Sequence, residues 1–136
     1  PHLTDHIEMD VFDVFQIPYS ALQLDHEIAI AKAARAGAGI VIRGGVARGE
    51  PGQGHGLTDV WASWKLARMD ELLEGMSATT FMLRFTLTNP HAHTTIVGTL
   101  NPTHLHENIA AALQGPLPTE IYDEAKRRLT AAQETS

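Results

Sequence analysis

The sequence predicts an α/β fold in which short parallel strands alternate with helices. Three short runs of apolar or β-branched residues are each followed by a stretch whose apolar residues recur at helical spacing, and glycine or proline stands at most boundaries. Alternation of this kind is typical of parallel β/α units. The 136 residues suit one compact domain or a piece of a larger one.

The first strand is predicted within residues 10–19, after the end of a helix over residues 3–9. Val11 and Phe12 belong to an apolar, β-rich run, and Pro18 ends the strand because proline lacks the amide that a central strand needs. We therefore expect a buried strand here.

The second strand is predicted over residues 39–42, after an alanine-rich helix over residues 24–36. Ile28 and Arg35 are among the helix residues that share one face at helical spacing. Gly37 stands where glycines commonly end helices.

Two helices are predicted before the third strand, after a glycine-rich loop over residues 50–56 that we expect to be mobile. The first helix covers residues 58–73. Ser77 is a favourable N-cap for the second, which ends before Asn89 and Pro90. The candidate packing residues of both helices are Val60, Trp61, Trp64, Leu66, Met69, Phe81, Met82 and Phe85.

The third strand, residues 94–97, leads to a helix over residues 102–114 and a last helix over about residues 118–132. Three strands alone leave two open sheet edges and poorly covered helices. The apolar faces expected on the two helices consist of Leu105, Ile109 and Leu113, and of Ile121, Ala125 and Leu129.

The composition limits the classes of function. A net charge of −6 argues against broad nucleic-acid binding. The absence of cysteine excludes disulfides and thiol chemistry. No apolar stretch is long enough to cross a bilayer and no signal peptide is recognisable, so we expect a soluble cytoplasmic protein without a membrane partner.

The junction between the third strand and its helix predicts an anion-binding site. Asn101 is a favoured N-cap, and Pro102 is favoured at the first helical position. Free backbone N–H groups and the helix dipole both attract negative charge at a helix N-terminus. A phosphate-bearing ligand is therefore expected beside Gly98 and Thr99.

Three segments, in order, resemble the C-terminal half of the aldo-keto reductases. Residues 13–20 (Asp-Val-Phe-Gln-Ile-Pro-Tyr-Ser) resemble the sixth barrel strand, residues 39–49 resemble the seventh, and residues 97–108 are similar to the cofactor-binding signature. The resemblance implies that residues 1–136 are a single segment of a (β/α)8 TIM barrel, roughly strands six to eight with their helices. It also implies that the N-terminal half is absent from this chain, which begins at Pro1.

The resemblance implies a nicotinamide dinucleotide and places its ring at the first two strands. Gln16 would hydrogen-bond the ring carboxamide; the alternative is a buried glutamine satisfied by neighbouring backbone. Arg43 stands where many members place a ring-stacking tyrosine, although arginine can also lie against a π-system or pair with phosphate. The residues expected near the pyrophosphate, through backbone contacts alone, are Gly44, Gly45 and Val46, and Arg48 is also expected to bind the cofactor.

The adenosine end is assigned by resemblance to the third strand and its helix. His104 stands where arginine or lysine is common, and protonated histidine is a better phosphate partner than neutral histidine. The resemblance implies NADP, with NAD possible. Glu107 and Asn108 match the pair that contacts adenine; the alternative is an ordinary exposed helix face. The full set at this end is Gly98, Thr99, Asn101, His104, Glu107 and Asn108.

The resemblance also implies a full-length oxidoreductase that reduces aldehydes or ketones by hydride transfer from NADPH. The tyrosine acid of the family and its lysine, aspartate and histidine have no matching motif here. No catalytic residue is therefore named, and this chain alone is expected to be inactive. The implied partners are the dinucleotide, a small carbonyl substrate and the missing half of the barrel. The alternative is a non-catalytic dinucleotide-binding barrel homologue or half-barrel that acts as a sensor or binds another protein.

Eight histidines raise the question of a metal site. His91 and His93 are two positions apart, as are His104 and His106, but no histidine pair has a recognised metal-binding spacing. Solvated or structural histidines are the better interpretation.

Overall fold

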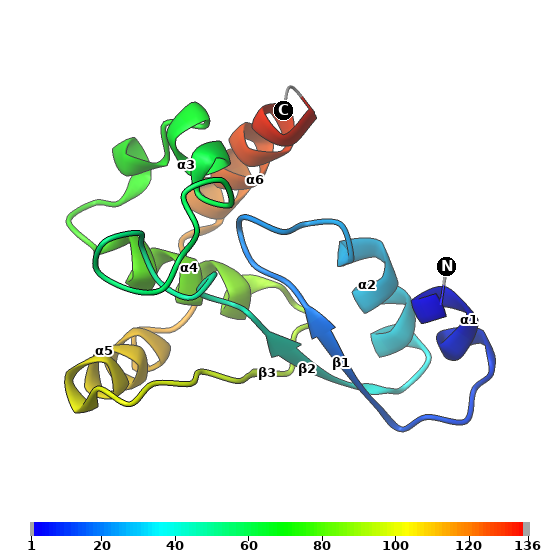
Figure 1. The fold of residues 1–136 in the computed structure, drawn as a ribbon. Helices are drawn as coiled ribbons and strands as arrows, with labels where there is room; N and C mark the ends of the chain where they lie inside the picture. Colours follow the sequence, from blue (N-terminus) through cyan, green and yellow to red (C-terminus); the bar gives the residue numbers. More distant parts are fainter. Residues whose placement is uncertain (1, 135–136) are drawn as a thin grey trace.

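A computed structural model describes residues 2–134, with a three-stranded parallel sheet at its centre (Figure 1). The strands are β1 (Val14–Pro18), β2 (Gly39–Arg43) and β3 (Thr94–Thr95), in the spatial order β1-β2-β3. In the register, Gln16 pairs with Val41, and Val41 pairs with Thr94. The predicted alternation of parallel strands with helices is confirmed.

The first and third strands are shorter than predicted. β1 begins at Val14, and Val11 and Phe12 are exposed, so the prediction of a buried strand from residue 10 is wrong. In the described chain the register pairs residues 14–18 with β2, and the carbonyl of Asp13 accepts one further hydrogen bond from the amide of Gly39 at 2.8 Å. β3 has two residues, and the amide of Ile96 adds one further hydrogen bond to the carbonyl of Ile42 at 2.8 Å.

The first two helices are α1 (His2–Glu8) and α2 (Glu27–Arg35). α2 buries Ile30 and Ala33, whereas Ile28 is 85% exposed, so the face predicted for this helix is wrong. In an alanine-rich helix several faces have similar hydrophobicity, and contact with β2 selects one of them.

The segment predicted as one helix over residues 58–73 forms two short helices. They are α3 (Ala62–Leu66) and the 3₁₀ helix η1 (Met69–Leu72), separated by Arg68, whose φ of 52° no α-helix accommodates. Trp61, Trp64 and Met69 are buried as predicted, but Val60 and Leu66 are exposed.

The next helix, α4 (Ala78–Thr88), has the predicted bounds. The hydroxyl of Ser77 accepts a hydrogen bond from the amide of Thr80 at 3.1 Å, which confirms the predicted N-cap. The helix ends at Asn89, before the proline.

The last two helices are α5 (Pro102–Leu113) and α6 (Thr119–Glu134). α6 buries Ala125 and Leu129 as predicted. On α5 the predicted apolar face is exposed, in line with the expectation of poorly covered helices, and no described segment covers Leu105, Ile109 and Leu113.

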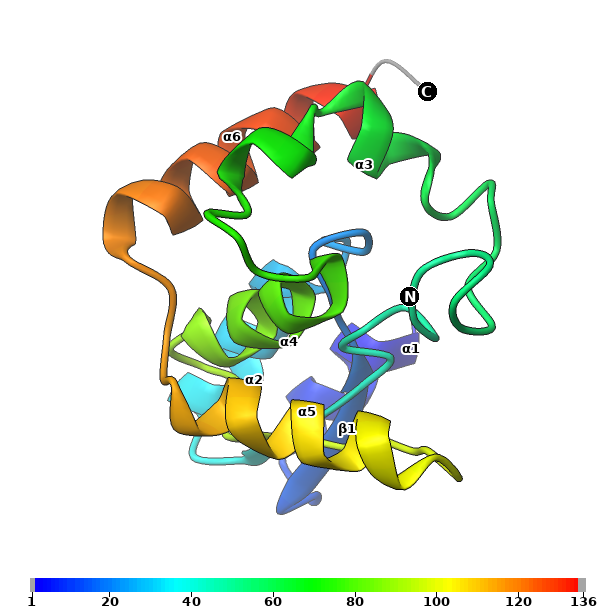
Figure 2. The same cartoon turned by 90° about the vertical axis from the view of Figure 1, so that its left-hand side faces the viewer.

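In both views α4 lies between the α3–α6 pair and α5 (Figures 1 and 2). Phe81 and Phe85 of α4 form the aromatic centre of the core: the ring of Phe81 meets Trp64 edge-on at 5.8 Å, and the ring of Phe85 lies 4.9 Å from Tyr122 of α6. None of the helices within residues 2–134 has the length and hydropathy needed to cross a membrane.

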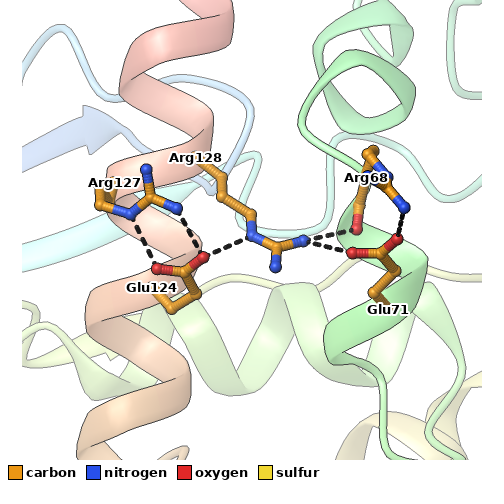
Figure 3. Close-up of polar contacts among 5 residues, drawn as sticks. All are labelled: Arg68, Glu71, Glu124, Arg127 and Arg128. Carbon is orange, nitrogen blue, oxygen red and sulfur yellow. Dashed lines mark hydrogen bonds and ion pairs between the residues drawn. The ribbon is translucent and has the colours of Figure 1, made fainter.

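An ion-pair network joins α6 to η1 (Figure 3). Arg128 donates to Glu124 on its own helix at 2.7 Å and to Glu71 of η1 at 2.9 Å, and it also donates to the carbonyl of Arg68 at 3.2 Å. Glu71 forms a second ion pair with Arg68. These contacts fix the orientation of the C-terminal helix against the α3–η1 segment.

Candidate functional site

An open groove of about 1180 Å³ lies between the turn after β2, the start of α4 and the segment that leads into α5. Residues 98–108, the segment of the predicted anion site, and residues 46–55 contribute equally to its lining. The residues predicted to bind a cofactor that line this groove are Val46, Arg48, Gly98, Thr99, Asn101, His104, Glu107 and Asn108.

The N-terminus of α5 has the predicted cap. The side-chain oxygen of Asn101 accepts a hydrogen bond from the amide of Thr103 at 2.9 Å, and Pro102 occupies the first turn. The hydroxyl of Thr99 accepts from the amide of Asn101 at 3.0 Å, which orders the approach to the helix. Within residues 2–134 the amide of His104 makes no hydrogen bond, so a donor is available at the groove.

A second helix N-terminus opens onto the same groove. Ser77 and Thr79, at the start of α4, belong to the lining. Each N-terminus carries about half a positive charge, so two such ends favour an anion between them. Sequence reasoning missed these residues as site residues; the N-cap signal at Ser77 located the helix but not its proximity to α5.

The glycine-rich loop supplies the remaining wall of the groove. Sequence reasoning treated residues 50–56 only as a loop, although Glu50, Gln53 and His55 line the groove. The sequence signal for a ligand-binding loop was the set of glycines after a strand end, because glycines permit the backbone to approach a ligand closely.

The charged side chains of the groove oppose one another. Arg48 is outnumbered by Glu50 and Glu107, and none of these three forms an ion pair in the described part of the chain. Attraction for an anion therefore depends on the two helix N-termini.

Gln16 and Arg43 lie outside the groove lining, on the uncovered face of the sheet. Both are exposed, and because Arg43 pairs with Pro18, two residues after Gln16, they share one face. Gln16 is thus not the buried, backbone-satisfied glutamine of the alternative interpretation.

The two glycines after β2 serve different structural purposes. Gly44 has φ of 73°, a conformation that favours glycine. At Gly45, a Cβ atom would lie 2.9 Å from Oγ1 of Thr95 and 3.2 Å from Cγ2 of Thr86, so close packing requires glycine. The carbonyl of Gly45 accepts from the hydroxyl of Thr86 at 3.0 Å.

Both tyrosines belong to the core rather than to the groove. Tyr19 is 0% exposed and Tyr122 is 9% exposed, and burial raises the pKa of each phenol. Neither tyrosine is therefore placed to give a proton to a ligand in the groove.

One histidine of the predicted pairs has a structural contact: Nδ1 of His93 accepts the amide of Ile40 at 2.9 Å. Among residues 2–134 no group of three or more histidine, aspartate or glutamate side chains is arranged to hold a metal ion.

The comparisons with known proteins concern the fold. No protein-family model and no curated protein match the chain. An aldo-keto reductase from Bacillus halodurans, AKR11C1, is similar in its apo form, with a TM-score of 0.75 and 18% identity over 93% of this chain and 47% of that chain. Its holo form gives a TM-score of 0.75 and 21% identity over 93% of this chain and 44% of that one.

The chain therefore spans somewhat less than half the length of the solved structures it resembles. The predicted resemblance is confirmed at the level of the fold: this chain has the α/β architecture of part of an aldo-keto reductase TIM barrel.

Proposed function

We propose that the groove binds the adenosine and phosphate end of a nicotinamide dinucleotide, NADP(H) in preference to NAD(H). The observation that carries the proposal is that the anion site predicted from residues 98–108 and the turn at Val46 and Arg48 line one groove. Two helix N-termini open onto it, as a phosphate site requires. The holo form of the similar reductase supports a bound cofactor in this fold.

The nicotinamide end would lie over the uncovered sheet face. Gln16 and Arg43 are exposed there on neighbouring strands, and ligands of β/α barrels bind at the carboxyl ends of the strands. Gln16 can hydrogen-bond the carboxamide, and Arg43 can lie against the ring or pair with a phosphate. When bound, the dinucleotide supplies the hydride; this chain binds and orients it.

The complete protein would reduce an aldehyde or ketone with NADPH. This chain contributes the cofactor site, and the proton donor comes from the part of the barrel outside it, because both tyrosines here are buried. Exposed apolar residues on the two sides of the molecule support the proposal that a partner covers them. They are Val11, Phe12 and Val14 at the start of β1 and just before it, Ile96 directly after β3, and Leu105 and Ile109 on α5.

A fluorescence titration with NADPH tests the site. Asn108→Ala should weaken binding about tenfold, the effect of one lost hydrogen bond at a well-ordered site, without changing the melting temperature. His106→Ala is the matched control, since His106 is exposed on the same helix and does not line the groove. Equal affinities for the wild type and Asn108→Ala would contradict the proposed site.

Activity requires a separate assay. Reduction of a panel of aldehydes and ketones by the complete protein, followed through NADPH absorbance, should show turnover. Tight NADPH binding with no turnover of any carbonyl compound would instead support a sensor.

A further inference from the structure

The turn after β2 holds three consecutive residues in the left-handed backbone region. The φ angles are 46° at Ala47, 63° at Arg48 and 82° at Gly49. Alanine and arginine rarely adopt this conformation, and they keep it only where surrounding contacts impose it. Because Arg48 lines the groove, the strained turn lies at the candidate site.

Two contacts outside the turn impose this conformation. The carbonyl of Arg48 accepts a hydrogen bond from the amide of His55 at 2.9 Å. The carbonyl of Ala47 accepts from Nε1 of Trp61 at 3.4 Å. The first contact comes from the same loop, whereas the second comes from the residue that precedes α3.

Trp61 connects the turn to the core. Its side chain is 3% exposed, and its ring lies 5.3 Å from the ring of Trp64, which packs on α4. At Gly56 a Cβ atom would lie 2.7 Å from Nε1 of Trp61, so the loop closes tightly over the indole. The buried indole of Trp61 thus supports the turn from the side of the core, and Trp61 itself does not line the groove.

Arg48 is free to serve a ligand. It is exposed, and its guanidinium has no ion-pair or hydrogen-bond partner in the part of the chain that the structure describes. The backbone conformation of Arg48 restricts which rotamers its side chain can adopt.

We propose that Trp61 is a positioning residue for Arg48: its indole holds the left-handed turn, which keeps the guanidinium at the groove for a ligand phosphate. The identity of that ligand rests on the proposed function. The support of the turn by Trp61 does not rest on the proposed function, and it can be tested without any ligand.

Limited proteolysis with trypsin, which cleaves after arginine, measures opening of the turn at Arg48. Trp61→Phe keeps an aromatic ring in the core but removes the N–H donor, so cleavage at Arg48 should become about three- to tenfold faster. Trp64→Phe is the matched control, because it removes an indole donor to Asp70 and leaves the contact to Ala47 intact. An unchanged rate in Trp61→Phe, or an equal increase in both variants, would overturn the proposal.

A titration with NADPH then tests whether Trp61 acts through Arg48. Trp61→Phe should weaken binding by a similar factor, and it should have no further effect in an Arg48→Gln background. Independent, additive losses would overturn the assigned role. If the wild type binds no NADPH, the proposed function fails, while faster cleavage at Arg48 in Trp61→Phe still supports the hold of Trp61 on the turn.

Discussion

Single side chains decide how the groove treats an anion, because its lining holds few fixed charges, with Arg48 against Glu50 and Glu107. His104 lies in the lining at the start of α5, beside the free donor of the helix N-terminus. The charge at position 104 therefore changes the net charge around the groove more than the same charge would change that of a strongly basic surface.

His104→Arg should increase the preference for NADPH over NADH about tenfold, because a permanent charge strengthens a hydrogen bond to the 2′-phosphate by roughly 1.5 kcal/mol. Competitive titration with both nucleotides measures it. His106→Arg adds the same charge outside the groove, and an equal preference in both variants would show that position 104 does not contact the phosphate.

Gly45→Ala should lower the free energy of unfolding by about 1–3 kcal/mol, because the added methyl group would crowd Thr86 and Thr95. Gly98→Ala is the control: a Cβ there meets no atom within 4 Å. Urea unfolding measures both variants. A loss as large in Gly98→Ala as in Gly45→Ala would rule out packing as the reason for glycine at position 45.

Much of the site at this scale could be predicted, since capping chemistry is local. Asn101 and Pro102 specify a helix start by their own preferences, and the structure has that cap. The contributions of Thr79 and His55 could not be predicted, because they depend on how α4 and the loop pack against α5.

At the scale of elements, the ion pair of Arg128 with Glu71 joins α6 to η1, and Glu124 on α6 pairs with the same Arg128 (Figure 3). Hydrogen bonds from Arg127 and Arg128 lower the pKa of Glu124 from 4.5 to about 2. A carboxyl whose pKa is lowered by folding stabilises the protein at pH values above the pKa that it has in the unfolded chain. This contribution is lost as the pH falls from about 4.5 towards 2.

Glu124→Gln should therefore lower the urea midpoint at neutral pH and leave a shallower decline of stability between pH 4.5 and about 2. Glu134→Gln, at the exposed end of the same helix, should leave the profile unchanged. Parallel pH profiles of the urea midpoint for the wild type and Glu124→Gln would show that the ion pairs of Glu124 do not contribute to stability.

Element boundaries could be predicted where a local stop signal exists. The N-cap of Ser77 and the proline after Asn89 fix α4 within a residue. The break at Arg68 and the buried face of α2 could not be predicted, because tertiary contacts override weak local preferences there.

At the scale of the whole molecule, the sheet and α5 present apolar residues that nothing in the described chain covers. We propose that the rest of a barrel covers them. The isolated chain should then bind a hydrophobic dye, and the complete protein should not. Leu105→Gln combined with Ile109→Gln should reduce dye binding by the isolated chain. A monomeric isolated chain without dye binding would contradict this proposal.

A crystal structure of the complete protein with NADP⁺ would locate the dinucleotide. We expect the adenosine phosphates between Arg48 and the N-terminus of α5, with His104 and Asn108 in contact and the nicotinamide ring over Gln16. A dinucleotide bound elsewhere, or an empty groove at saturating NADP⁺, would contradict the proposed site.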